Sequence, residues 1–221
     1  MTKELRVTGK GNIQVVPDLT IVSVTLSKTE TTYKQALVSS SKESKELKEL
    51  LLPLGIKEES IKTKMFNVEP HYAYYKDKYG DSKSKVDGYT FNHRVNFKFD
   101  IDNKLLGKIL YQLTKSKTAS NIEINYSFKD VEGAKNKLLK SAVDDAFKKA
   151  KILEESTGVK LVNIGSINYS FDELDININP FSRRFTQNLL CDCECNGSID
   201  LDVNPEDISL GDVVTITWEI E

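Results

Sequence analysis

A strict alternation of side chains along residues 89–99 constrains the fold of this chain more than any other feature. Apolar or aromatic side chains and one histidine occupy every second position, and polar or charged side chains lie between them. The apolar set consists of Tyr89, Phe91, His93, Val95, Phe97 and Phe99. Because successive side chains of a β-strand point to opposite faces, this pattern predicts a strand with one buried face. Residues 19–28 repeat it with Val22, Val24 and Leu26, so the chain must build a sheet that is covered on one face.

Further strands are expected near both ends of the chain and between its helices. They cover residues 5–16, 61–70, 122–128, 161–171, 199–203 and 214–220. Gly9 and Gly11 interrupt the first of these, and glycine within a strand pattern indicates a bulge or a sharp bend. A phosphate-binding loop can also begin with such a glycine pair, but it needs a helix directly after it, whereas a strand follows here. We therefore expect a bulge or bend at Gly9 and Gly11.

Helical spacing of apolar residues occurs in three segments, of which two are shorter. The first helix begins after Thr32. Thr32 and Gln35 have the separation of a capping box, in which Gln35 lies in the first turn, and the helix ends before Pro53. Its expected buried stripe consists of Ala36, Leu37, Ser40, Ser44, Leu47 and Leu51. The second helix covers residues 103–114, with Asp102 as its N-cap.

The longest helix is expected over residues 131–157, between an Asp130 cap and Gly158, which is suited to the left-handed conformation that ends helices. Its buried stripe consists of Val131, Ala134, Leu138, Ala142, Ala146, Ala150 and Leu153. Because alanine side chains are small, this stripe predicts that the helix packs closely against a sheet.

The order of these elements is ββαββαβαβ, followed by one or two closing strands. Hairpins outnumber helical crossovers, which favours an α+β fold with mostly antiparallel sheets, one long helix and two shorter helices packed on a face. The 221 residues are enough for one large domain over residues 1–221, or for two closely packed lobes. Two parts are less regular: residues 72–88 form a polar hairpin connection rich in Tyr and Lys, and residues 172–197 form an irregular excursion.

Charge and hydropathy exclude several classes of protein. The 31 Lys and Arg residues nearly balance the 33 Asp and Glu residues, so no whole-chain field would attract nucleic acid or an anionic membrane. No apolar run approaches the roughly 20 residues that span a bilayer. The first six residues lack the apolar core of an export signal. We therefore expect a cytoplasmic protein if Met1 is the native start, and a periplasmic or secreted one if an export signal has been removed.

The three cysteines, Cys191, Cys193 and Cys195, lie close together in sequence, so no disulfide joins distant parts of the fold. In an extended strand their thiols would share one face, about 6 to 7 Å apart, which suits one soft metal ion or, with distortion, one disulfide. The spacing lacks the Cys-x-x-Cys knuckle of common zinc sites, and no fourth ligand is evident nearby. A metal or redox site is therefore an alternative to small, half-buried strand residues, and we expect no cofactor.

The hairpin connection combines aromatic rings with cations. Its tyrosines are Tyr72, Tyr74, Tyr75 and Tyr79, and Lys76, Lys78, Lys83 and Lys85 lie among them. Single-stranded nucleic acid or an acidic partner uses this mixture, but Asp77, Asp81 and Asp87 dilute the charge. We therefore interpret the connection as a mobile hairpin loop that contributes to a subunit or protein contact, and we do not expect nucleic-acid binding.

No set of catalytic residues is evident. His93 is in register with the aromatic residues of a buried face, which favours a hydrogen-bonded core imidazole, whereas His71 begins the polar connection and is expected to be solvated. A Gly-x-Ser-x-Gly nucleophile elbow is absent from the sequence. We therefore expect a protein that is not an enzyme.

Several of these segments share residues with a known family. The shared residues are Gly9, Gly11, Pro17-Asp18, Leu51 to Ile56, Thr63, Gly88-Tyr89, Ala142, Asp145-Ala146, Lys149-Ala150, Gly158, Leu161 and the closing stretch 214–220. Over most of its length the chain resembles the SIMPL domain family, also called the oxidative-stress defence or periplasmic immunogenic protein family. It departs from the family in lacking an export signal and in the cysteine-containing segment 179–195.

The resemblance implies an α+β protein that assembles into oligomers and has no established catalytic residues. Bacterial members are often exported and linked to defence against oxidative stress, and a eukaryotic branch acts as a signalling adaptor. We therefore expect a homo-oligomeric, non-enzymatic protein that supports a stress response or acts as an interaction scaffold for another protein. A thiol redox or metal-binding protein that uses Cys191, Cys193 and Cys195 is the alternative.

Overall fold

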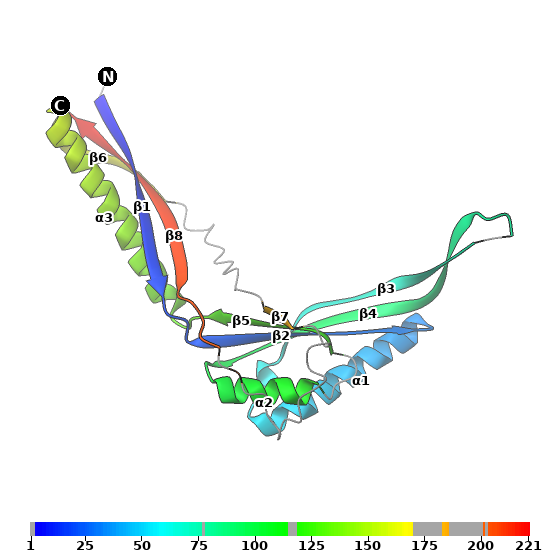
Figure 1. The fold of residues 1–221 in the computed structure, drawn as a ribbon. Coiled ribbons are helices and arrows are strands. Elements are labelled where there is room, and N and C mark those ends of the chain that lie inside the picture. The colour runs from blue at the N-terminus through cyan, green and yellow to red at the C-terminus, as the bar shows by residue number, and fades with distance from the viewer. Residues whose placement is uncertain (1–2, 77, 115–118, 170–182, 186–200, 202) are drawn as a thin grey trace. The chain divides into compact units, whose positions relative to one another are not determined.

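A computed structural model describes residues 3–76, 78–114, 119–169, 183–185, 201 and 203–221. Its elements follow the predicted order ββαββαβαβ with two further strands, and the α+β class with antiparallel sheets is confirmed (Figure 1). The chain forms two compact units, each with its own hydrophobic core. The first unit contains described residues from 1–18, 127–179 and 205–221, and the second contains those from 19–126 and 180–204.

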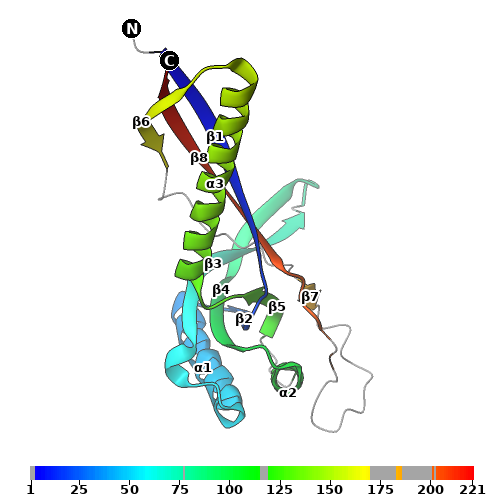
Figure 2. The ribbon, with the colours of Figure 1, turned by 90° about the vertical axis from the view of Figure 1, so that its left-hand side faces the viewer.

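The first unit is a three-stranded sheet with one helix. The strand order is β1-β8-β6, and both strand pairs are antiparallel. Its elements are β1 (Lys3–Val15), α3 (Val131–Thr157), β6 (Leu161–Asn168) and β8 (Ile208–Ile220). Helix α3 runs along β1 and β8 (Figure 2). Its alanine stripe packs against side chains of both strands, as predicted. The buried core residues of this unit are Val7, Ala142, Ala146, Ala150, Val214, Ile216 and Trp218.

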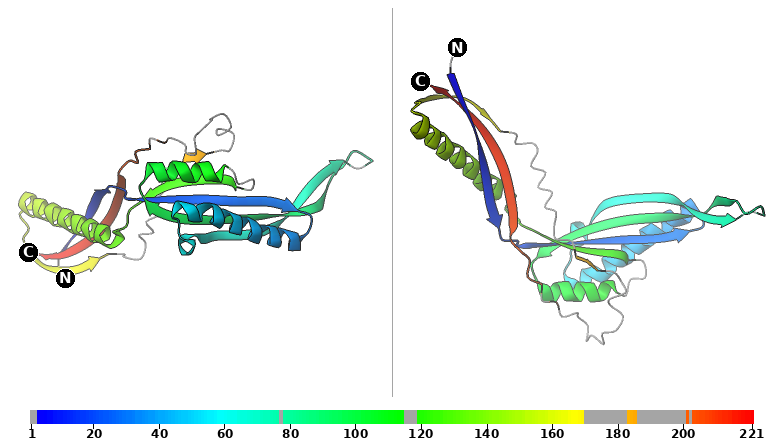
Figure 3. Two further views of the ribbon diagram at one scale, coloured as in Figure 1. Left: turned by 90° about the horizontal axis from the view of Figure 1, so that it is seen from below. Right: turned by 45° about the horizontal axis from the view of Figure 1, so that its top comes forward.

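The second unit is a five-stranded sheet with two helices on one face (Figure 3). The strand order is β3-β4-β2-β5-β7. Its elements are β2 (Leu19–Glu30), α1 (Tyr33–Leu51), β3 (Lys62–Lys76), β4 (Ser82–Asp100), α2 (Asn103–Leu113), β5 (Ala119–Ser127) and β7 (Arg183–Phe185), with short 3-10 helices at Leu52–Leu54 and Glu58–Ser60. The alternating residues Val22, Val24 and Leu26 are fully buried in this core, as are Phe91 and Phe97, so the predicted buried face is confirmed.

Side-chain caps explain where α2 and α3 begin. Asp102 Oδ1 accepts a hydrogen bond from the backbone N–H of Lys104 (2.9 Å), and Asp130 Oδ1 accepts one from that of Gly133 (2.9 Å). These bonds satisfy N–H groups that have no partner within the helix. At the other end of α3, Gly158 has a φ of +76°, a left-handed conformation that glycine adopts without strain. All three predicted boundary residues are confirmed.

The prediction of a bulge or bend at Gly9 and Gly11 is wrong. β1 pairs with β8 along its whole length without a register shift. A Cβ atom on Gly9 would lie 2.1 Å from the carbonyl oxygen of Ala142, and a Cβ atom on Gly11 would lie 2.4 Å from that of Leu138. Glycine is therefore required because the backbone of α3 lies directly against the strand.

Helix α3 also covers polar backbone groups of β1, which is an edge strand. The backbone N–H of Lys10 donates to Asp145 Oδ2 (2.7 Å), and Lys149 Nζ donates to the carbonyl oxygen of Thr8 (3.3 Å). Lys149 and Asp145 also form an ion pair at 2.7 Å. Side chains of one helix thus satisfy backbone groups that an edge strand otherwise leaves open to another chain.

Three details of the expected helices and strands differ in the structure. Val131 and Leu153, expected in the buried stripe of α3, are 37% and 38% exposed, and the buried part of the stripe runs from Ala134 to Ala150. Leu37, expected in the buried stripe of α1, is 39% exposed because it lies about 100° around the helix from the buried Ala36. Leu201 and Val203, expected in a strand, are not part of one, and β8 begins at Ile208. Within the expected excursion at residues 172–197, only the backbone of β7 belongs to the described residues. No helix in the described part of the chain is long and apolar enough to cross a membrane.

Candidate functional site

The connection expected at residues 72–88 is a two-stranded ribbon, which we call the arm (residues 71–76 and 78–87). β3 and β4 stay paired along it up to Lys76 and Ser82. Gly80 in the turn has a φ of +88°, which favours glycine. The register shifts between His71 and Tyr72, and from Tyr72 to Lys76 the pairing is regular, so it sets which face of the arm each side chain of that stretch occupies.

Strand β2 ends and helix α1 begins at the base of the arm. The last pair between β2 and β4 joins Glu30 to Tyr89, and a Cβ atom on Gly88 would lie 2.8 Å from the carbonyl oxygen of Glu30. Helix α1 begins at Tyr33, whose ring meets that of Tyr89 edge to face with centroids 5.8 Å apart. Beyond this level, within the described chain, β3 and β4 pair only with each other (Figures 1 and 3). A two-stranded ribbon by itself is only marginally stable in water.

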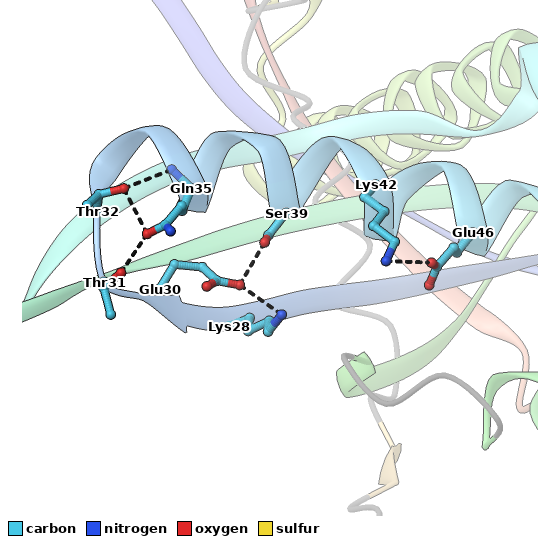
Figure 4. A network of polar contacts seen from close by, with 8 residues as sticks. All are labelled: Lys28, Glu30, Thr31, Thr32, Gln35, Ser39, Lys42 and Glu46. Atoms are coloured by element: carbon cyan, nitrogen blue, oxygen red, sulfur yellow. Dashed lines mark hydrogen bonds and ion pairs between the residues drawn. The ribbon is translucent and has the colours of Figure 1, made fainter.

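A polar network holds the end of β2 against the start of α1 (Figure 4). Glu30 Oε1 accepts a hydrogen bond from Ser39 Oγ (2.7 Å) and forms an ion pair with Lys28 Nζ (2.8 Å). The contact with Lys28, and then that with Ser39, holds the pKa of the Glu30 carboxyl below its usual value. Thr32 Oγ1 accepts from the backbone N–H of Gln35 (3.2 Å), which confirms the predicted N-cap. The base of the arm is thus tied to a helix, although the arm itself is not.

The four tyrosines of the arm do not form one cluster. Tyr72 and Tyr74 share one face of β3, whereas Tyr75 lies on the opposite face. Tyr79 lies near the turn beside Lys78, whose Nζ is 5.0 Å from the ring centroid. Tyr74 and Tyr79 are 82% and 77% exposed, and the other two rings are about half exposed.

One apolar residue of the arm was missed by reasoning from the sequence. Val86 pairs with Tyr72 across the ribbon and is half exposed. Directly paired residues lie on the same face of a ribbon, so Val86 joins Tyr72 and Tyr74 there. A valine among Lys83, Lys85 and Asp87 is the signal that could have revealed it. We call Tyr72, Tyr74 and Val86 the apolar face of the arm.

The remaining residues of the arm carry both signs of charge. Its lysines are Lys76, Lys78, Lys83 and Lys85, and its described carboxylates are Asp81 and Asp87. His71, half exposed as predicted for a solvated residue, has its Nε2 3.9 Å from Asp87 Oδ1. A mixed and partly apolar surface of this kind can pack against a protein and form charged hydrogen bonds at its rim.

His93 lies beneath α1 and makes the hydrogen bonds expected of a core imidazole. Its Nε2 is 2.9 Å from Thr63 Oγ1, and its Nδ1 is 3.4 Å from Ser40 Oγ. Burial, and after it the charge of Lys48, lowers the pKa of the imidazole. Its strand partner Phe66 lies five residues before His71 on β3, roughly 16 Å along the strand, so the two histidines do not share a site.

The predicted thiol site cannot be placed on this framework. Cys191, Cys193 and Cys195 all lie outside the described residues. Within the residues that are described, no three His, Cys, Asp or Glu side chains gather as metal ligands would. A metal or redox role for the three cysteines stays a prediction.

Comparisons with known proteins agree with the resemblance seen in the sequence. The family model SIMPL, described as a protein of unknown function (DUF541), matches residues 5–218. The 26 kDa periplasmic immunogenic protein of Brucella melitensis biotype 1 is 24% identical over 164 residues, and that of Brucella abortus strain S19 is 23% identical over 164 residues. Each match covers 74% of this chain and 65% of the relative, so it spans less than two thirds of the relatives' length.

Proposed function

The chain belongs to the SIMPL family of proteins of unknown function, and on this premise we propose that it is a non-enzymatic protein that assembles with copies of itself through the arm. The observation that carries the proposal is the apolar face of Tyr72, Tyr74 and Val86 on a ribbon to which no third strand or helix of the described chain is added. Aromatic residues are enriched in protein interfaces, and burial of this face would stabilise a ribbon that is marginal in isolation.

The charges of the arm favour a second copy of the chain as its partner. Four lysines and three aspartates are interspersed over residues 76–87, and the whole chain has a net charge of only -2. A polyanion or an anionic membrane selects dense positive charge, which this surface lacks. Two nearly neutral chains of mixed charge can meet without long-range repulsion.

The non-enzymatic part of the proposal is supported by the chemistry around His93. Both of its ring nitrogens face hydroxyl groups of the protein, those of Thr63 and of the buried Ser40. The imidazole therefore serves the packing between α1 and the sheet rather than a solvent-facing reaction.

The proposed compartment follows the names of the relatives, whereas the proposed role follows the family resemblance of the sequence. Both Brucella proteins carry the word periplasmic in their names, and we propose the periplasm as the location of this chain, with a supporting role in a stress response. Fractionation of cells that express the native gene would test the location. Recovery of the protein with cytoplasmic markers would contradict it.

The assembly proposal is tested by light scattering after size-exclusion chromatography of the reduced protein, with and without a chelator. We expect a defined oligomer whose mass does not change with the chelator. The double variant Tyr72→Ser with Tyr74→Ser, here the arm variant, should lower that mass. Val38→Ser, which alters an exposed apolar residue on α1, is the matched control and should leave it unchanged.

Two results would overturn the proposal. The first is a wild-type protein that is monomeric at micromolar concentration, and the second is an arm variant with the wild-type mass. An oligomer that dissociates with the chelator would instead favour the alternative site at Cys191, Cys193 and Cys195.

A further inference from the structure

The arm has two open backbone edges, one on each of its strands. β3 is the outermost strand of the five-stranded sheet, so no strand of the described chain lies beside its outer edge (Figure 1). The outer edge of β4 is paired with β2 only as far as Tyr89, and no described strand lies beside it from Ser82 to Gly88. Backbone N–H and C=O groups along such an edge are a template for a strand of another chain.

The outer edge of β3 is protected inside the sheet but not in the arm. Before the arm, β3 has a register shift between Thr63 and Met65 and a proline at position 70. Both features prevent regular pairing at an edge, because a shift displaces the backbone groups and proline lacks an N–H. From Tyr72 to Lys76 the edge has neither feature. The arm is therefore the stretch of β3 to which another strand can add regularly.

The two strands of the arm are complementary to each other. Tyr72 pairs with Val86 on the apolar face, and Tyr75 pairs with Lys83 on the opposite face, which also carries Lys85. β3 runs toward the turn and β4 runs away from it, so the two edges of the arm have opposite directions. Two arms that lie side by side and point the same way therefore meet as antiparallel strands.

From these edges we infer that arms of different copies pair side by side, the β3 edge of one arm with the β4 edge of the next. The inference rests on the function proposed above and adds the groups that make the contact. Backbone hydrogen bonds would join each arm to its neighbour. The apolar faces would join into one continuous surface.

Another arm suits these edges better than an unrelated strand does. One added peptide covers only one edge of an arm, whereas a row of arms covers both edges of each arm within it. The seam between two arms repeats the pairing of β3 with β4 that every arm already contains. Lys76 lies on the face opposite to Lys83 and Lys85, so joined apolar faces leave no two of these lysines directly opposed. A seam between two β4 edges would instead place Lys83 and Lys85 of both copies along one face.

A seam between β3 and β4 joins two different edges and is therefore heterologous. Copies would continue as a row that closes into a ring or extends as a filament. A seam between two β3 edges would be isologous, with arms that point in opposite directions, and would stop at a dimer. Single cysteines on one strand or the other distinguish these arrangements.

The test is disulfide formation between variants that carry one cysteine each, after replacement of the three native cysteines by serine. Two variants, Ala73→Cys and Tyr75→Cys, have their thiol on β3, and two others, Lys83→Cys and Lys85→Cys, have it on β4. Each β3 variant is co-expressed with each β4 variant and oxidised with glutathione disulfide. The four combinations cover three registers of the seam, because these positions pair with one another within a single arm.

A matched control uses the protected part of the same strand. Met65 is 48% exposed on β3 and lies on the same face as Ala73, but on the other side of Pro70. Met65→Cys therefore replaces Ala73→Cys in a parallel set of mixtures. Light scattering and circular dichroism check that each variant is folded and keeps the wild-type mass, and alanine takes the place of serine if the serine background does not.

We expect a covalent dimer on a denaturing gel in at least one mixture of a β3 variant with a β4 variant. No covalent dimer is expected from a variant expressed alone, because equivalent thiols of adjacent arms are two strands apart, about 10 Å, which exceeds the reach of a disulfide. Mixtures that contain Met65→Cys should give none.

An assembly that depends on the arm but gives no covalent dimer in any mixture would overturn this inference and leave the proposed function intact. A dimer from a β3 variant alone, or from a β4 variant alone, would overturn it as well, since it would show a seam between two like edges. A monomeric wild-type protein would contradict the proposed function itself, and this inference with it.

Discussion

β1 is an edge strand of the first unit and the arm is a two-stranded ribbon of the second, and the fold treats the two in opposite ways. The backbone of α3 lies against Gly9 and Gly11 of β1, and helix side chains satisfy polar groups that β8 does not pair. The arm extends past the end of β2 and the start of α1, with Tyr74 mostly exposed. Where an edge serves only the fold, the chain's own helix covers it. Where no part of the described chain covers an apolar ribbon, another molecule is expected to bind it.

The largest effect on stability is expected where α3 covers β1. Gly9→Val places a side chain where a Cβ atom already lies 2.1 Å from the Ala142 carbonyl oxygen. We expect a loss of about 3 kcal/mol in the free energy of unfolding, because α3 must move away from β1. Urea denaturation measures it. Gly165→Ala, where the nearest atom is 3.6 Å away, is the control and should change stability by less than about 0.5 kcal/mol.

A smaller effect is expected from the polar half of the same contact. Lys149, and after it the backbone N–H of Lys10, holds the pKa of Asp145 below its ordinary value of 3.8. The stability that Asp145 contributes is therefore present above pH 3.8 and is lost as the pH falls through the folded-state pKa. Asp145→Asn should lower stability at neutral pH and flatten the acid limb of the curve of melting temperature against pH. The neighbouring variant Asp144→Asn should retain that limb, and an equal change in both variants would argue against a specific contact with β1.

The imidazole beneath α1 offers a test near neutral pH. Burial, with Lys48, lowers the pKa of His93 from its ordinary value of 6.5, so the unfolded chain binds a proton more readily than the folded chain. Stability should therefore fall as the pH decreases below 6.5 through the folded-state pKa, and it should be fully present above 6.5. Melting temperatures at pH 7.5 and 5.5 measure the fall. It should shrink in His93→Gln and persist in His71→Gln, and an unchanged fall in His93→Gln would assign it to another group.

The smallest effect on stability is expected at the arm, which no other element of the described chain covers. Tyr74→Ser removes a ring that is 82% exposed, so the free energy of unfolding under dissociating conditions should change by less than about 0.5 kcal/mol. Urea denaturation at low protein concentration measures this. A loss near that of Gly9→Val would mean that the arm packs within its own chain, and the contrast between the two edges would disappear.

Much of the fold could be predicted because its signals are local. Asp102, Asp130 and Gly158 mark helix ends by bonds or backbone angles within a few residues, and the structure has all three. The alternation of Val22, Val24 and Leu26 specifies a face without reference to what covers it, and all three are buried. Family membership also followed from residues spread along most of the chain.

The predictions that failed share a physical cause. Each depended on where another helix or strand lies, which the local sequence does not show. Gly9 and Gly11 have the same pattern as a bulged strand, and only the position of α3 shows that space rather than backbone bending requires them. The composition of the arm suggests a loop, but cross-strand pairing with β4 keeps it a ribbon and divides its tyrosines between two faces. Val86 gains its significance from being opposite Tyr72.

By itself, the sequence determined the order of helices and strands, the helix caps, the buried faces and the family, because periodicity and capping act over a few residues. Only the tertiary structure decided that α3 approaches β1 closely enough to exclude a side chain, and that the arm extends beyond β2 and α1. These outcomes depend on distances between segments far apart in the chain, and such distances are set by packing rather than by local preference.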